Sequence, residues 1–99
     1  MASGWGLFYR WDKRKAAINL RKHGVTFEEA ATTFSDPLSI TVPDHKHSNG
    51  EQRLFSIGRS WKDRLIAVVH TETENEIRII SARKTTRKEA KAYEEGEEY

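Results

Sequence analysis

Near the start of the chain, apolar residues recur with the spacing of a helix. Asp12 is a residue type that caps helix N-termini, and alanine and leucine recur at helical spacing between Lys15 and Lys22. Gly24 follows where a helix commonly ends on a left-handed residue. Before this helix, large apolar side chains crowd residues 6–11, a run short enough to favour a strand. We therefore predict a short strand and then a helix that ends at Gly24.

A second helix is predicted directly after this glycine. Its apolar side chains fall at helical spacing and form one stripe: Phe27, Ala30, Ala31 and Phe34. Thr26 and Glu29 fit a capping box, in which each side chain bonds to the other residue's backbone N–H. The helix should end before Pro37, because the residue that precedes a proline disfavours helical geometry.

From Leu38 onward the pattern changes to strands with short connections. Four runs have strand-like composition: Leu38 to Val42, Arg53 to Ser60, Arg64 to Thr71 and Glu76 to Ala82. Residues 43–50 form a polar loop, and Thr86 with Glu89 fits a second capping box that starts a final helix before Gly96. Short connections predict antiparallel pairing.

The predicted fold class is therefore α+β. We expect a single twisted antiparallel sheet of four or five strands, with two N-terminal helices and one C-terminal helix packed on one side. No repeat or linker divides the chain, so residues 1–99 are interpreted as one domain. We expect residues 1–7 to be extra or flexible and residues 95–99 to fray.

Composition narrows the kind of chemistry. Hydrophobic residues make up 36% of the chain and charged residues 32%. The core is therefore too small to bury a functional site deeply, and we expect functional side chains at the surface. The absence of cysteine excludes disulfides, thiolate zinc sites and cysteine nucleophiles. No apolar run approaches the ~20 residues of a membrane span, and residues 1–6 lack the pattern of a signal peptide. We expect a cytoplasmic protein with no membrane contact.

Charge is distributed unevenly along the chain. The formal net charge is +2, but four of the fifteen acidic residues lie among the last six positions. Without those six positions, seventeen basic and eleven acidic residues remain, a net charge of +6. A basic body attracts polyanions, so nucleic acid is the leading partner class.

Arginines flank or interrupt the predicted strands, at Arg53, Arg59, Arg64, Arg78 and Arg83. Cleaving RNA without a metal requires activation of a ribose 2′-hydroxyl, stabilisation of a charged phosphorane and protonation of the leaving oxygen. Guanidinium groups suit the second task, because their planar fork pairs with two phosphate oxygens. The alternative is that these arginines form the polar face of a half-solvated sheet, paired with glutamates on neighbouring strands.

Histidines and one glutamate are candidates for proton transfer. His23 lies at a predicted helix C-terminus, where the helix dipole favours its protonated form, although a histidine there can simply bond the last carbonyls. Glu51 is the second candidate. His70 lies inside an apolar run and is interpreted as a packed strand residue. Asp44, His45 and His47 resemble a metal site only weakly, because no further ligand lies at a fixed spacing.

A basic cluster, residues 83–88 with Lys91, lies where the last strand meets the last helix, a position that favours anions, although such a run can also be a solvated surface. Trp61, in a predicted turn, is the aromatic residue expected to be exposed and able to stack on a base. We interpret six residues as RNA-binding candidates: Lys22, Arg59, Trp61, Lys84, Arg87 and Lys88.

Several blocks of the sequence, in this order, resemble the BrnT family of toxins. They are Trp11-Asp12, Lys15, Asn19, Lys22-His23-Gly24-Val25, Phe27-Glu28-Glu29-Ala30, Phe34, Asp36-Pro37, Asp44, Glu51, Arg53, Ile57-Gly58, Arg64 and Arg78-Ile79-Ile80-Ser81-Ala82-Arg83. The resemblance runs from about residue 8 to residue 94. Lys13 departs from it, standing where the family often has proline.

The resemblance implies a RelE-like fold and a ribonuclease activity that inhibits translation. It also implies a BrnA-like antitoxin that pairs two toxins in a 2:2 complex and that binds operator DNA. The RelE catalytic set cannot be placed on this sequence residue by residue, so kinship of fold identifies no general base.

The favoured hypothesis is a metal-independent endoribonuclease without a cofactor. In it Arg53, Arg64, Arg78 and Arg83 hold the phosphate, while His23 or Glu51 transfers protons. One alternative is a non-catalytic basic module that binds nucleic acid or an acidic partner protein. A weaker one is a metal nuclease that uses Asp44, His45 and His47.

Overall fold

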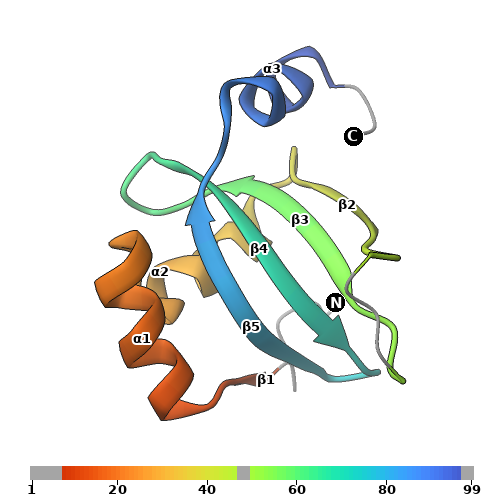
Figure 1. Ribbon diagram of the computed structural model, residues 1–99. Coiled ribbons are helices and arrows are strands. Elements are labelled where there is room, and N and C mark those ends of the chain that lie inside the picture. The colour runs from red at the N-terminus through yellow and green to blue at the C-terminus, as the bar shows by residue number, and fades with distance from the viewer. Residues whose placement is uncertain (1–7, 47–49, 97–99) are drawn as a thin grey trace.

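The computed structural model describes residues 8–46 and 50–96. Five strands form one sheet in the order β1-β5-β4-β3-β2 (Figure 1). The strands are β1 Phe8–Arg10, β2 Ile40–Pro43, β3 Leu54–Arg59, β4 Leu65–Glu72 and β5 Glu76–Lys84. The α+β class is confirmed, and four of the strands form the predicted antiparallel meander.

One edge of the sheet differs from the expectation. Strand β1 pairs with β5 in parallel, with Phe8 opposite Glu76 and Arg10 opposite Arg78. The prediction of a wholly antiparallel sheet is therefore wrong at this edge. Short connections force antiparallel pairing only between strands that are neighbours in the chain, whereas β1 meets a strand more than sixty residues away.

The helices are α1 Lys13–His23, α2 Phe27–Thr32 and α3 Arg87–Glu95, and a 3₁₀ turn, η1, covers Thr33–Ser35. Asp12 caps α1, and Gly24 ends it with φ of 71°, as predicted. The predicted second helix is shorter than its apolar stripe, because its last turn tightens into η1. Thr86 and Glu89 form both hydrogen bonds of the predicted capping box.

The core lies between one face of the sheet and the first two helices. Val25, Phe27 and Ala30 pack there against Ile66, Val68 and other residues of β4 and β5. We call this the inner face of the sheet. Helix α3 does not join α1 and α2, contrary to the expectation that all helices lie on one side; it lies beyond the end of β5 and contacts β3 (Figure 1).

Gly58 on β3 allows η1 to approach the inner face closely. A Cβ atom at this position would lie 2.9 Å from the Thr33 carbonyl oxygen and 3.0 Å from the Thr33 Cβ. The backbone of η1 would have to move to accept any larger residue. Among the described helices, none is both long and apolar enough to cross a membrane.

Candidate active site

The outer face of the sheet, opposite α1 and α2, carries most of the predicted arginines. Ile77 and Ile79 of β5 point into the core, so Arg78 between them points outward. Ala82 also belongs to the core, so its neighbour Arg83 points outward too. Two residues five positions apart face the same side only if the strand contains an extra residue.

A β-bulge supplies that extra residue. Val69 pairs with Ser81 but His70 pairs with Ile79, which leaves Ile80 without an opposite residue. After the bulge, the residues that face outward are shifted by one position along β5. Arg78 and Arg83 consequently share the outer face.

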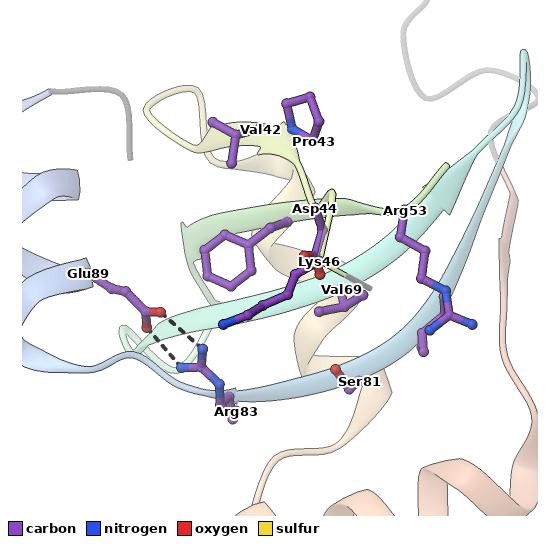
Figure 2. Close-up of a pocket in the computed structure, with 11 residues that line it drawn as sticks. Val42, Pro43, Asp44, Lys46, Arg53, Val69, Ser81, Arg83 and Glu89 are labelled. Carbon is purple, nitrogen blue, oxygen red and sulfur yellow. Dashed lines mark hydrogen bonds and ion pairs between the residues drawn. The ribbon is translucent and has the colours of Figure 1, made fainter. Parts of the chain in front are cut away.

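A hollow of about 570 Å³ opens on this outer face. Its lining combines apolar floor residues with charged side chains: Val42, Pro43, Asp44, Lys46, Arg53, Phe55, Val69, Ile80, Ser81, Arg83 and Glu89. We call it the arginine pocket. Lys46 extends over the pocket toward the end held by Arg83, whereas Arg53 lies at the opposite end (Figure 2). Three cations therefore surround one hollow.

The Arg83 guanidinium is held in a fixed orientation. It donates two hydrogen bonds to the Glu89 carboxylate, from Nη1 at 2.8 Å and from Nη2 at 3.0 Å, and it lies 5.9 Å from the centre of the Phe55 ring (Figure 2). Burial alone would raise the pKa of the Glu89 carboxyl, but hydrogen bonds from Arg83 and Thr86 outweigh burial and keep that pKa below its usual value. Glu89 is therefore ionised at neutral pH and restrains a half-exposed cation.

Two neighbouring arginines continue this basic surface toward the β1 edge. Arg78 pairs with Glu51, and Arg10, its register partner on β1, pairs with Glu76 at 2.9 Å. Arg10 and Arg78 both line two smaller hollows beside the arginine pocket. The structure thus brings Arg53, Arg78 and Arg83 onto one face.

The structure places Arg64 elsewhere. Its Nε donates to Glu29 at 2.9 Å, and Nη2 donates to Glu29 as well as to the Gly24 carbonyl at 3.3 Å. Glu29 is 1% exposed and also accepts from the Ser60 hydroxyl at 2.7 Å. The hydrogen bond from Arg64 lowers the pKa of the Glu29 carboxyl against the opposing effect of burial. Arg64 lies at the corner between α1 and α2.

This ion pair also corrects the first predicted capping box. Thr26 accepts from the Glu29 backbone N–H at 3.0 Å as expected, but the Glu29 side chain is engaged by Arg64 and Ser60 instead of turning back to Thr26. A buried carboxylate gains more from a guanidinium than from one neutral N–H. His23 ends α1 next to this corner, so neither His23 nor Arg64 lines the arginine pocket.

The predicted RNA-binding residues are divided among three places. Lys84, Arg87 and Lys88 are exposed around the junction of β5 and α3, next to the Arg83 end of the pocket. Arg59 and Trp61 line a separate shallow hollow, with Arg59 stacked over the Tyr93 ring and Trp61 70% exposed as predicted. Lys22 is exposed on α1, away from the pocket.

The remaining titratable candidates are three histidines and Asp44. His70 is fully buried, within 2.7 Å of the Ser56 hydroxyl and edge-on to Phe34, which confirms its interpretation as a packed strand residue. Asp44 lines the arginine pocket and His45 is exposed beside it, while His47 falls outside the described residues. No cluster of three or more metal-ligating side chains occurs in the part of the chain that the structure describes.

Some residues of the site were not proposed from sequence. Lys46, Phe55 and Arg10 gave no local signal of function, and Glu89 was interpreted only as a helix cap. The signal that would have identified Glu89 is its position six residues after Arg83, across a strand-to-helix turn. The others depend on pairing between distant segments.

The fold and the pocket together define a class: a small α+β protein that presents a basic pocket on the outer face of a five-stranded sheet. A family model described as "Ribonuclease toxin, BrnT, of type II toxin-antitoxin system" matches residues 11–89, most of the chain. The chain therefore belongs to the BrnT family of ribonuclease toxins of type II toxin-antitoxin systems.

The comparison with solved structures agrees with this fold. The 1.1 Å crystal structure of the Brucella abortus ribonuclease toxin BrnT is similar, with a TM-score of 0.62 and 24% sequence identity over 82% of this chain and 99% of that chain. At this identity the likeness establishes the fold alone. No curated protein matches the chain.

Proposed function

We propose that this protein is a metal-independent endoribonuclease and that the scissile phosphate of RNA binds in the arginine pocket. The observation that carries the proposal is that Lys46, Arg53 and Arg83 all line one hollow of the outer face, with Lys46 extending toward Arg83. Fixed cations stabilise the negative charge that develops on a phosphorane, a task for which other nucleases use a metal ion.

The proposed reaction is an internal transesterification. The ribose 2′-oxygen attacks the adjacent phosphorus while the bond from phosphorus to the 5′-oxygen breaks, giving a 2′,3′-cyclic phosphate and a free 5′-hydroxyl. Arg83 binds the non-bridging oxygens, Arg53 at the opposite end of the pocket binds the adjacent phosphate, and Lys46, which extends toward Arg83, supplies the proton that the leaving 5′-oxygen takes up. A carboxylate removes the 2′-hydroxyl proton; Asp44 in the pocket and Glu51 beside Arg78 are the two candidates.

The other predicted residues take more distant roles. We propose that Arg78 binds a neighbouring phosphate, and that Lys84, Arg87 and Lys88 bind the RNA backbone beyond the Arg83 end of the pocket. The roles first predicted for His23 and Arg64 in the reaction, and for Lys22, Arg59 and Trp61 in RNA binding, remain predictions from the sequence. None of these five residues lines the arginine pocket.

Family membership supports the biological setting of this proposal. We propose that cleavage of RNA arrests translation in the cytoplasm until a BrnA-like antitoxin neutralises the toxin in a 2:2 complex. We propose that the antitoxin, and not this protein, contacts operator DNA. An acidic, partly disordered antitoxin segment that covered the arginine pocket would block the substrate directly.

The experiment is cleavage of a labelled single-stranded RNA by the purified protein in the presence of EDTA. Arg83→Ala should lower the rate of cleavage about 100- to 1000-fold, whereas Lys13→Ala, which removes one exposed cation of α1, should cleave at the wild-type rate. The expected products carry a cyclic phosphate. Cleavage that appears only when a divalent metal is added, or a rate that Arg83→Ala leaves unchanged, contradicts the proposal.

One observation favours the alternative of a non-catalytic binding module. On the outer face, Arg10, Arg78 and Arg83 each already pair with a glutamate. If these carboxylates hold the guanidinium groups for binding only, labelled RNA will be retained by the wild-type protein in EDTA and recovered uncut.

A further inference from the structure

Helix α1 carries an unusual excess of positive charge. Five of its eleven residues are basic and none is acidic; the basic residues are Lys13, Arg14, Lys15, Arg21 and Lys22. All five are exposed. Among the described residues, none of the five forms an ion pair, in contrast to Arg78 and Arg83 on the sheet. These cations are available to a binding partner.

The arrangement of charge within α1 is unfavourable for the helix itself. Lys13, Arg14 and Lys15 fill the first turn, where the positive end of the helix dipole favours acidic residues. Each of these cations is repelled by the helix dipole, whereas an acidic residue at the same position would be attracted to it. Asp12 at the N-cap offsets part of this repulsion. A helix that served only to cover the core would gain stability from glutamates at these positions.

An apolar side chain lies in the middle of these cations. Ile18 is 46% exposed, and Arg14, Arg21 and Lys22 stand four residues before it and three and four residues after it, so all three neighbour it on the helix surface. Nucleic-acid backbones offer phosphates but nothing that pairs with an aliphatic side chain. A protein segment offers both carboxylates and an apolar contact, so the surface fits a protein better than RNA.

Lys15 lines one of the two hollows that Arg10 and Arg78 share beside the arginine pocket, whereas Arg14, Ile18, Arg21 and Lys22 line none of the hollows described on the outer face. Asn19, next to Ile18 in the chain, turns toward the sheet instead: it is buried and bonds to the backbone of Ala82 on β5. Figure 1 shows α1 at the periphery, on the far side of β5 from α3. A partner bound to the outer side of α1 would not occupy the pocket.

We propose that the exposed face of α1 docks an acidic segment of a partner protein, with one apolar side chain seated on Ile18 and carboxylates paired with Arg14, Arg21 and Lys22. We assign this partner to the antitoxin that a type II toxin-antitoxin family implies, and for that identification the inference rests on family membership rather than on the proposed reaction. The segment on α1 would anchor the partner, leaving a second segment to reach the pocket.

The test uses a designed fourteen-residue helical peptide of glutamate and leucine as the probe, with binding followed by NMR of the isotope-labelled protein. Two control peptides separate the contribution of charge to binding from that of the apolar contact: one replaces glutamate by lysine, and the other replaces leucine by serine. We expect the glutamate-leucine peptide to shift the amide signals of α1 and not those of the pocket. Both control peptides should bind at least about tenfold more weakly, since loss of about 1.4 kcal/mol corresponds to tenfold.

Protein variants complete the test. Arg14→Glu and Ile18→Ser should each weaken binding of the glutamate-leucine peptide at least about tenfold. Lys91→Glu, the same charge reversal on α3, should change the affinity for this peptide less than about twofold. Arg14→Glu should cleave RNA at the wild-type rate. Equal affinity for the lysine peptide, or shifts confined to the outer face of the sheet, would overturn the proposal.

Loss of RNA binding by Arg14→Glu without loss of peptide binding would also overturn it, because α1 would then be an RNA surface. A protein that binds the peptide on α1 but fails to cleave RNA would leave this inference intact while contradicting the proposed reaction. The two ideas therefore fail by different measurements.

Discussion

Arg78 and Arg83 lie five residues apart on one strand, yet both side chains leave the same face of the sheet. Strict alternation would put them on opposite faces, and the bulge at Ile80 removes that constraint. Both guanidinium groups can therefore contact one RNA strand that crosses β5. Arg83 lines the arginine pocket, whereas Arg78 lies in the neighbouring hollows, so their contributions to catalysis should differ.

Replacing each arginine by alanine should separate binding from chemistry. Arg83→Ala should lower kcat about 100- to 1000-fold, the effect of removing one donor to a developing oxyanion. Arg78→Ala should raise KM about tenfold and leave kcat nearly unchanged, because a hydrogen bond to a charged group away from the reacting atoms contributes about 1.5–3 kcal/mol to binding. Steady-state cleavage of a short fluorescent RNA measures both constants. Equal effects on kcat would mean that both arginines contact the scissile phosphate.

Arg64 should act on stability rather than on the reaction. Arg64→Ala leaves Glu29, which is 1% exposed, without its cation, and should destabilise the protein by about 3 kcal/mol, the lower end of the range for breaking a buried pair, because Arg64 is 30% exposed. Urea unfolding measures this loss. Glu29→Gln in the same protein should recover part of it, since a neutral amide needs no counter-charge.

A second readout separates this role from the catalytic one first predicted for Arg64. At a temperature where Arg64→Ala is still folded by circular dichroism, its kcat should match the wild-type value within about twofold. A large fall in kcat for the folded variant would return Arg64 to the catalytic set and would require the substrate to reach the corner between α1 and α2.

Asn19 should be a major contributor to folding. Its side-chain amide donates to the Val25 carbonyl at 3.0 Å and to the Ala82 carbonyl at 2.7 Å, and its oxygen accepts from the Ala82 N–H at 3.1 Å. Asn19→Ala leaves buried backbone groups unsatisfied and should destabilise by about 3 kcal/mol in urea unfolding. The same replacement at exposed Asn75 should cost less than about 0.5 kcal/mol.

Features set by neighbouring residues were predictable from the sequence, and features set by distant pairing were not. The end of α1 at Gly24 and the capping box of Thr86 and Glu89 depend on residues within one or two turns, so local pattern identified both. The parallel pairing of β1 with β5 and the bulge at Ile80 depend on strands that meet only after folding. No local pattern distinguishes them from an ordinary strand.

The same distinction between local and distant determinants applies to the residues of the candidate site. Arg53, Arg78 and Arg83 were identified because arginine among apolar strand residues is unusual, and the structure places all three on one face. Arg64, which directly precedes β4, produced the same local signal but pairs with Glu29 at the corner between α1 and α2. Local sequence shows that a cation flanks a strand but not which carboxylate it will meet.

Stability should fall with acidity before the carboxylates begin to titrate, and His70 should be the cause. Burial lowers the pKa of His70 from 6.5 to about 4, so the unfolded chain binds a proton over that range while the folded protein does not. The stability associated with neutral His70 is therefore complete above pH 6.5 and is lost as pH falls toward 4. The expected loss at pH 4.5 is about 2–3 kcal/mol, at about 1.4 kcal/mol for each pH unit.

The carboxylates with lowered pKa values affect stability over a lower pH range than His70 does. Glu29, Asp36 and Glu89 stabilise the fold above the usual carboxyl pKa, near 4, and lose that contribution only at lower pH. Urea unfolding of the wild type and of His70→Gln between pH 7 and 4.5 isolates the histidine, because glutamine can still bond to Ser56 but takes up no proton. The difference in stability between the two proteins should change by about 2–3 kcal/mol over this range. A change below about 1 kcal/mol would mean that Glu72, whose carboxylate lies 3.5 Å from the His70 Nδ1, stabilises the protonated ring inside the folded protein.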